Sequence, residues 1–121
     1  MREEMRRAML QPVYFDFDRA DLREDARNIL DRKLEILQHH SDVRIRVEGH
    51  ADERGSDEYN IALGQRRAAA VKRYFTQRGI ADNRIEIVSF GEERPVCTEH
   101  EESCWWRNRR AEFVILQGLV P

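Results

Sequence analysis

One acidic residue and two arginines stand out near the middle of the chain. Asp52 and Arg54 lie in the polar segment GHADERG (49–55), and Arg67 follows Asp52 by fifteen positions. A guanidinium donates charge-assisted hydrogen bonds to carboxylates, and a carboxylate accepts them from an ammonium. Side chains of both signs at one place therefore suit a zwitterionic ligand that carries an ammonium and a carboxylate on one carbon. The alternative is an ion pair within the protein, between Arg67 and Asp52 or Glu48.

The helix expected after this segment has polar residues on its inward face. At about 100° per residue, one narrow stripe holds Asn60, Leu63, Arg67, Val71 and Tyr74. Val71 and Tyr74 suit a hydrophobic core, whereas an arginine is seldom buried without a partner. We therefore expect the N-terminal end of this helix to serve a polar site.

Other candidate chemistry is weaker. His50 has no H-x-H or H-E-x-x-H partner, so we expect a solvent-facing or structural histidine and no metal site. We also expect no catalytic residues, because the sequence has no nucleophile elbow and no metal-ligand spacing. A small hydrolase that uses Asp52, His50 and Glu48 is the alternative in a different functional class.

Two cysteines, Cys97 and Cys104, have six residues between them in a polar stretch. Their spacing favours a local disulfide, which would indicate an oxidising compartment. A metal site that includes His100 has no evident fourth ligand, and two reduced thiols are the remaining alternative. The adjacent Trp105 and Trp106 could anchor a partner or pack beneath this loop.

The hydrophobic periodicity predicts the elements that position these residues. We expect strands at 13–17, 43–48, 84–89 and 110–117, helices at 22–39 and from Ser56 to about Arg78, and a long polar loop at 90–107. Asp21 and Ser56 are the expected N-caps, and Gly79 is the expected left-handed cap residue. The order β-α-β-α-β-β predicts an α/β (α+β) two-layer sandwich with two main helices on one face of a mixed four-stranded sheet.

Length and charge bound the organisation of the chain. A length of 121 residues allows one domain, which we expect at 12–117, with an N-terminal tail or linker remnant at 1–11 and a C-terminal tail at 118–121. A net charge of −2 argues against non-specific nucleic-acid binding. Because residues 1–10 lack the apolar stretch of a signal peptide, we expect a cytosolic chain or a domain cut from a longer precursor.

Residues 43–68 resemble the signature of the OmpA-like peptidoglycan-binding family. The spacing D-x-x-G-x-x-x-x-N-x-x-L-x-x-x-R runs from Asp52 to Arg67, and VYFDFD (13–18), SFGEERP (89–95) and NRRAEF (108–113) follow the family's order. Many relatives have threonine where this chain has Ala51 and serine where it has Gly64. Neither difference removes a charged contact.

The resemblance implies a site for the meso-diaminopimelate residue of the peptidoglycan stem peptide, without catalysis and without a cofactor. It implies that Asp52 binds the ligand ammonium and Arg67 its carboxylate. The other residues implied for the pocket are Arg54, Asn60, Leu63, Phe17 and Asp18.

The resemblance also implies a setting, the periplasm beside the outer membrane of a Gram-negative cell. The implied role is to tether that membrane to the cell wall. In the lipoprotein subgroup, which this chain resembles most, it implies TolB and other Tol-Pal proteins as partners, and membrane contact only through an N-terminal lipid anchor that this sequence does not contain. The alternative settings are the C-terminal domain of a porin or of a flagellar stator protein.

Overall fold

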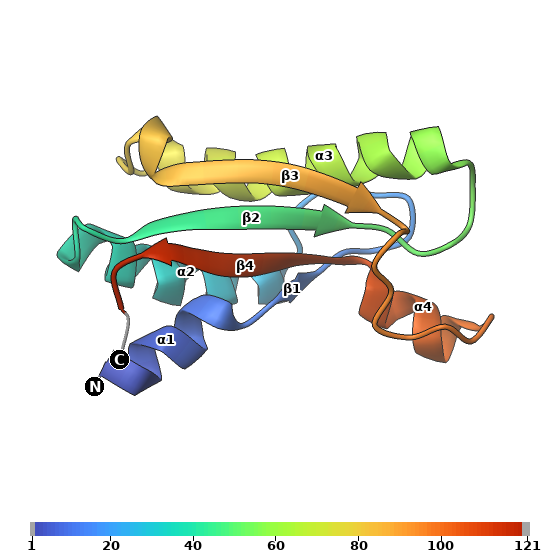
Figure 1. Cartoon of the computed structure of the whole chain (residues 1–121), viewed down its shortest axis with the longest axis horizontal. Coiled ribbons are helices and arrows are strands. Elements are labelled where there is room, and N and C mark those ends of the chain that lie inside the picture. Colours follow the sequence, from blue (N-terminus) through green and yellow to red (C-terminus); the bar gives the residue numbers. More distant parts are fainter. Residues whose placement is uncertain (1, 120–121) are drawn as a thin grey trace.

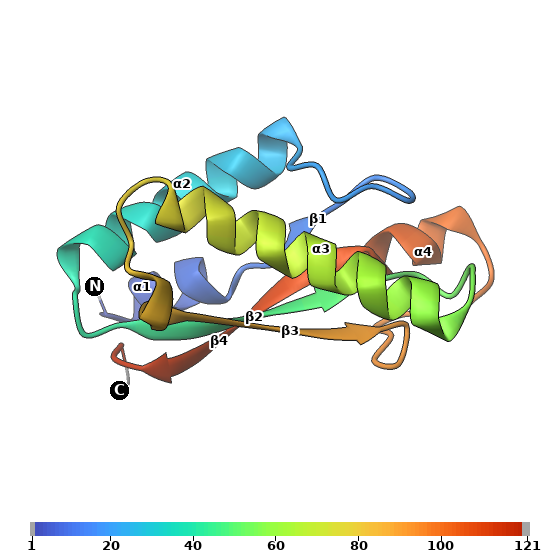
Figure 2. The same cartoon turned by 90° about the horizontal axis from the view of Figure 1, so that it is seen from above.

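The computed structural model describes residues 2–119 and has two layers, a sheet and the helices that cover one of its faces (Figures 1 and 2). The elements in chain order are α1 (Arg2–Leu10), β1 (Val13–Tyr14), α2 (Glu24–His39), β2 (Arg44–His50), α3 (Asp57–Thr76), the short 3₁₀ helix η1 (Asp82–Arg84), β3 (Ile85–Gly91), α4 (Glu102–Asn108) and β4 (Arg110–Gln117). Within the described residues, no helix is both long and apolar enough to span a membrane.

The four strands are ordered β1-β4-β2-β3. β2 and β3 are parallel and are joined through α3, whereas β4 is antiparallel to both β1 and β2. The expected two-layer sandwich with a mixed four-stranded sheet is therefore confirmed. The long connection before β4 allows this strand to insert between β1 and β2.

The hydrophobic core lies between the sheet and the helices α2 and α3. Ile45 and Val47 of β2 point into it and meet Val71 and Phe75 of α3, all four without exposed surface. Because successive side chains of a strand point to opposite faces, the residues between them in β2 point to the other face of the sheet. We call this face, which lies opposite α2 and α3 and is toward the viewer in Figure 1, the open face.

The helix α3 approaches β2 most closely at a pair of glycines. A Cβ atom added to Gly49 would lie 1.7 Å from the carbonyl oxygen of Gly64, and one added to Gly64 would lie 2.8 Å from the carbonyl oxygen of Gly49. Backbone therefore packs on backbone here, which seats the N-terminal half of α3 against the carboxyl end of β2. This contact gives a packing reason for glycine at position 64.

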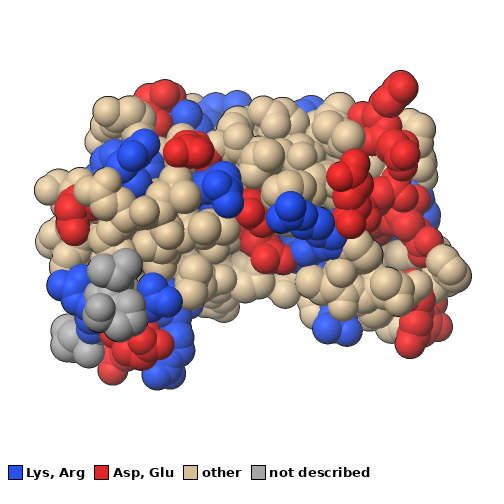
Figure 3. Space-filling view, viewed as in Figure 1, with Lys and Arg blue, Asp and Glu red and all other residues tan. Residues whose placement is uncertain are grey.

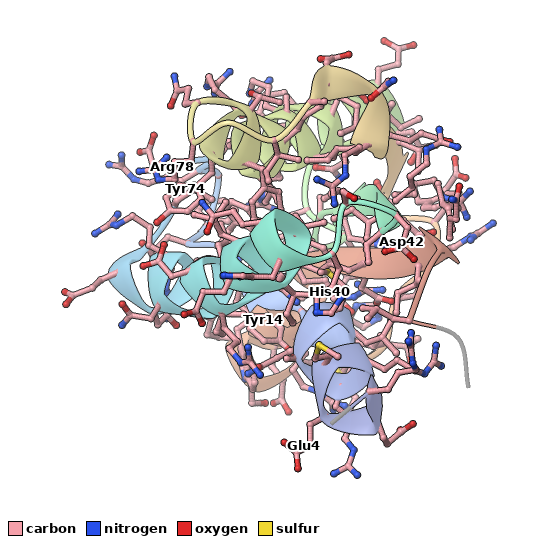
Figure 4. The ribbon with its side chains drawn as sticks, turned by 90° about the vertical axis from the view of Figure 1, so that its left-hand side faces the viewer. Glu4, Tyr14, His40, Asp42, Tyr74 and Arg78 are labelled. Atoms are coloured by element: carbon pink, nitrogen blue, oxygen red, sulfur yellow. A yellow bond between two sulfur atoms is a disulfide. The ribbon has the colours of Figure 1, made fainter. Side chains whose placement is uncertain are left out.

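The chain termini differ from the expected tails. Residues 2–10 form α1, which packs on α2 and β4 and buries Met9 completely (Figure 4). The Lys33 ammonium donates hydrogen bonds to the last carbonyls of α1, to Ala8 O at 2.8 Å and to Met9 O at 2.7 Å. In the expected C-terminal tail, Leu119 is buried in the core, and residues 120–121 lie outside the described residues.

Several element boundaries also differ from the expectations. α2 begins at Glu24, and its N-cap is Arg23 rather than Asp21. The Asp21 carboxylate instead accepts a hydrogen bond from the Arg19 side chain. β1 is shorter than expected, because pairing with β4 covers only two residues. The expected loop at 90–107 contains the short helix α4.

The expected ends of α3 are mostly found. The Ser56 hydroxyl accepts from Tyr59 N at 3.1 Å. The helix ends at Thr76 rather than near Arg78, and Gly79 has a φ of +97°. The N-terminal end of α3 therefore lies where the sequence places it, beside the end of β2.

Candidate functional site

The candidate site lies at the carboxyl end of β2, at the right-hand end of Figure 1, where the loops after β1 and β2 meet the start of α3. A cavity of about 320 Å³ opens there. Its lining residues are Phe17, Asp18, Asp52, Arg54, Gly55, Tyr59, Asn60 and Leu63. The structure thus brings six of the seven expected site residues to one cavity, and Arg67 is the one that does not line it.

Asp52 is the buried anion of the cavity, with 4% of its surface exposed. Its Oδ1 accepts hydrogen bonds from the backbone N and Nε of Arg54 at 3.0 and 3.1 Å, and its Oδ2 accepts from Nη2 of Arg54 at 2.8 Å. Arg109 Nη1 lies 3.5 Å from the same Oδ2. Burial alone would raise the pKa of Asp52, but the Arg54 hydrogen bonds outweigh it and leave the pKa below its usual range. The carboxylate is therefore charged at neutral pH.

Arg54 is held between two aromatic rings. Its guanidinium carbon lies 3.8 Å from the centroid of Phe17 and 4.0 Å from the centroid of Trp105. The indole Nε1 of Trp105 donates to Glu53 at 2.7 Å, which fixes the orientation of that ring. The cation is thus positioned at the cavity by contacts to both faces of its plane.

Arg67 lies beneath the loops and has no exposed surface. Its guanidinium donates to three backbone carbonyls: Nε to Arg19 O at 2.8 Å, Nη1 to His50 O at 2.8 Å and Nη2 to Asp16 O at 3.0 Å. Burial lowers its pKa to about 10, so the side chain stays charged at neutral pH. Arg67 therefore ties the loop after β1 to the end of β2.

The carboxylates considered as ion-pair partners of Arg67 contact other arginines. Asp52 binds Arg54, and Glu48 lies 3.6 Å from Arg46 Nη2. The expected inward stripe of α3 is nevertheless present, because Asn60, Leu63, Val71 and Tyr74 are buried along with Arg67.

Asn60 and Asp18 complete the cavity wall. The Asn60 amide donates to Arg54 O at 3.1 Å and to Glu92 Oε1 at 2.9 Å, and so joins the loop after β2 to the turn after β3. Asp18 has a φ of +58°, which aspartate tolerates better than most residues, and it accepts a hydrogen bond from the Tyr59 hydroxyl.

The helix α4 contributes residues that the sequence analysis did not assign to the site. Arg109, at its C-terminal cap, donates to both carboxylate oxygens of Glu102 at 2.7 and 3.0 Å while it approaches Asp52. The NRRAEF motif and the adjacent tryptophans were the available signals. Trp105 packs at the site, whereas Trp106 remains 43% exposed and meets the edge of Tyr14.

The position of α4 follows from a short covalent loop. Cys97 and Cys104 form a disulfide, with their Cα atoms 5.4 Å apart. The Asn108 side chain also holds the start of this loop, because its oxygen accepts from Val96 N at 2.9 Å. Trp105 follows Cys104 directly, so the disulfide restrains the wall that carries the indole.

The fold and this site define a small α/β domain with a mixed-charge pocket, and the chain belongs to the OmpA family, whose model matches residues 14–109. A curated relative, the peptidoglycan-associated lipoprotein of Brucella melitensis, is 46% identical over 103 residues, which cover 85% of this chain and 61% of that protein. The chain therefore spans about three fifths of that relative's length.

Solved structures agree with this assignment. The crystal structure of the peptidoglycan-associated lipoprotein from Burkholderia pseudomallei matches with a TM-score of 0.84 and 42% identity, over 87% of this chain and 89% of that one. The C-terminal domain of Helicobacter pylori MotB has a TM-score of 0.80 over 90% of this chain and 86% of that one. Its identity of 22% makes it evidence for the shared fold alone.

Proposed function

We propose that this domain binds peptidoglycan non-covalently, through the meso-diaminopimelate residue of the stem peptide. The observation that carries the proposal is the pairing of Asp52 with Arg54 inside one cavity with apolar walls. The end of the meso-diaminopimelate side chain has an ammonium and a carboxylate on one carbon. Such a group complements an anion and a cation held side by side.

In the ligand-free protein, the Asp52–Arg54 pair occupies the positions that the ligand's charges would take. The ligand ammonium would replace the Arg54 guanidinium at Asp52, and the released guanidinium would bind the ligand carboxylate. One internal ion pair would thus be exchanged for two intermolecular ones. Because Asp52 is nearly buried, its contact with an ammonium would be poorly screened by solvent.

The two arginines have different parts in this proposal. Arg54 lines the cavity, so we assign it the first contact with the ligand carboxylate. Arg67 donates to three carbonyls and still has a second hydrogen on each Nη atom. The direct contact between Arg67 and the ligand carboxylate stays a prediction. With or without that contact, the buried positive charge of Arg67 favours a bound anion in the cavity.

Selectivity against lysine follows from the same geometry. A lysine-containing stem peptide has the ammonium but lacks the neighbouring carboxylate. Its binding would leave the displaced Arg54 guanidinium without a partner, at a cost of about 1–3 kcal/mol.

The name and fold of the relatives support a role in tethering the outer membrane to the cell wall, in the periplasm. We propose that setting for the protein that contains this domain, with TolB and other Tol-Pal proteins as candidate partners. A porin or stator setting is the alternative, and only the fold shared with MotB favours it.

Binding without catalysis is part of the proposal. The residues of the alternative hydrolase do not share one site, because Asp52 contacts Arg54 and Arg109 whereas His50 and Glu48 contact each other on the open face. The relatives' names describe an association with peptidoglycan and no reaction.

The test compares thermal unfolding with a diaminopimelate-containing muropeptide and with its lysine-containing counterpart. At a ligand concentration of about 100 times the dissociation constant, binding should stabilise the fold by about 2.7 kcal/mol. Equal shifts with both muropeptides would contradict the assigned carboxylate contact, and no shift with either would contradict binding. Mass spectrometry of the same mixtures should show intact muropeptides, and cleavage products would contradict a binding-only role.

A further inference from the structure

A second polar cluster lies on the open face of the sheet and takes no part in the ligand pocket. Glu48 and Glu112 face each other across the β2–β4 pair, and His50 lies two residues after Glu48 on the same face. One donor atom from each of these three side chains lies within 4.8 Å of the others. Figure 3 shows acidic side chains between basic ones in the middle of this face.

His50 is buried in this cluster without a hydrogen-bond partner. It is 1% exposed, and neither of its ring nitrogens has a partner. Among the described residues, the buried side-chain atoms without partners are these two nitrogens and Nε of Arg46, which belongs to the same surface. Because an unsatisfied buried polar atom is costly, the arrangement calls for a ligand at the imidazole.

We propose that Glu48, His50 and Glu112 form a binding site for a divalent transition-metal cation of the Zn²⁺ type. One imidazole nitrogen and two carboxylate oxygens are donors that Zn²⁺ accepts, and a fourth position would remain for water. The imidazole favours a transition metal over Mg²⁺ or Ca²⁺, which prefer oxygen ligands throughout. The proposal departs from our expectation of no metal site. That expectation considered motifs within one segment, whereas the third proposed ligand lies on another strand.

The ligand atoms need only small movements to close on a cation. His50 Nε2 lies 3.6 Å from Glu48 Oε1, while the other oxygen of Glu48 lies 3.6 Å from Arg46 Nη2. In metal sites, a carboxylate commonly binds the metal through one oxygen and a neighbouring donor through the other. The Arg110 side chain donates to Oε2 of Glu112 and would hold that carboxylate in the same manner.

The charges around the three side chains set the expected affinity. Arg46 Nη2 lies 3.6 Å from Glu48, and Arg110 donates to Glu112. The nearby arginines weaken the attraction for a cation, so we expect lower affinity than in a site built from thiolates.

The experiment titrates the whole chain with Zn²⁺ by isothermal titration calorimetry. We expect one ion per chain, and an affinity at least 10-fold lower in H50Q and in E112Q. The matched control is H100Q, which removes the other histidine–carboxylate contact, between His100 and Glu53 at the surface. Mg²⁺ and Ca²⁺ should not compete. Equal affinity in H50Q, loss of binding in H100Q, or no saturable binding by the wild type would overturn the proposal.

A second measurement keeps the test independent of folding defects. Imidazole ¹⁵N resonances of the wild-type chain should shift at His50 on addition of Zn²⁺. A shift at His100 or at the pair His39 and His40, with His50 unchanged, would show adventitious surface binding and would also overturn the proposal. Neither measurement depends on peptidoglycan, so their outcome is separate from that of the pocket experiments.

Discussion

Arg54 folds back onto Asp52, two residues before it, and donates its backbone N, Nε and Nη2 to the two carboxylate oxygens at 2.8–3.1 Å. The anion and the cation of the pocket are thus paired within one turn of chain. The charges of this pair balance each other, and a zwitterion that binds to both side chains adds no net charge.

Substitution of Arg54 by alanine should remove the discrimination between stem peptides. The affinity for a diaminopimelate-containing muropeptide should fall by about 10- to 100-fold, because the carboxylate loses its charged donor. The affinity for the lysine-containing muropeptide should change less. Calorimetric titration with both peptides measures the ratio, and Arg32→Ala on the exposed face of α2 is the control. An unchanged ratio would assign the carboxylate to Arg67 instead.

Substitution of Trp105 by alanine should weaken binding without a direct ligand contact. The Arg54 guanidinium would lose one of its two aromatic neighbours, a contact worth about 0.5–1 kcal/mol at an exposed site. We expect a several-fold loss of affinity in the same titration and a smaller loss in Trp105→Phe. Trp106→Ala is the matched control, and an equal loss there would indicate general damage to α4.

Arg67 should be required for stability as well as for binding. Its replacement by methionine leaves three carbonyls without their donor, and we expect a loss of about 3 kcal/mol or more in urea denaturation. Lysine should restore the charge but not all three bonds. Arg66→Ala, on the exposed face of the same helix, should stay within about 0.5 kcal/mol of the wild type. A fully stable methionine variant would contradict the role of Arg67 in tying the two loops together.

The contact between Gly49 and Gly64 predicts a large effect of a single methyl group. A Cβ at Gly49 would collide with a backbone oxygen, which no rotamer change can relieve. Gly49→Ala should therefore cost about 4 kcal/mol or more. Gly79→Ala, where a Cβ meets no atom within 4 Å, should cost only about 1–2 kcal/mol for its positive φ. If chemical denaturation shows similar losses of unfolding free energy for Gly49→Ala and Gly79→Ala, the close packing of α3 on β2 is contradicted.

Lys33 should make stability depend on pH above neutrality. Burial lowers its pKa from 10.5 to about 7 in the folded chain. Between these values the unfolded chain binds the proton and the folded chain does not, so the free energy of unfolding rises with pH. Between pH 7 and pH 9, the free energy of unfolding of the wild type should rise by an amount on the order of 2 kcal/mol more than that of Lys33→Met, as measured by urea denaturation. Parallel pH profiles of the two proteins would contradict this role of Lys33.

Much of this architecture could be predicted from local patterns. The periodicity around Val47 and Val71 placed the second strand and the second long helix, and the stripe of Asn60, Leu63 and Arg67 pointed inward as expected. These features depend on spacing within one element, which the sequence shows directly. The resemblance to the OmpA-like family likewise implied six side chains that share one cavity.

Contacts between distant segments could not be predicted in this way. The helix α1 is short, and its last carbonyls accept hydrogen bonds from Lys33, 24 residues after Met9. Trp105 reaches the pocket only because α4 folds back beside Arg54. The pairing of Glu48 with Glu112 depends on the insertion of β4 between β1 and β2, which no local pattern reveals.

The position of α1 has a mechanical consequence for a domain proposed to act as a tether. In Figure 1, α1 lies at the left-hand end against β4, and the pocket lies at the right-hand end beyond β2. A pull between these two ends would be directed along the strands, and part of it would pass from β4 to β2 through the ladder that joins them. The ladder's hydrogen bonds would then be loaded together in shear rather than opened one after another.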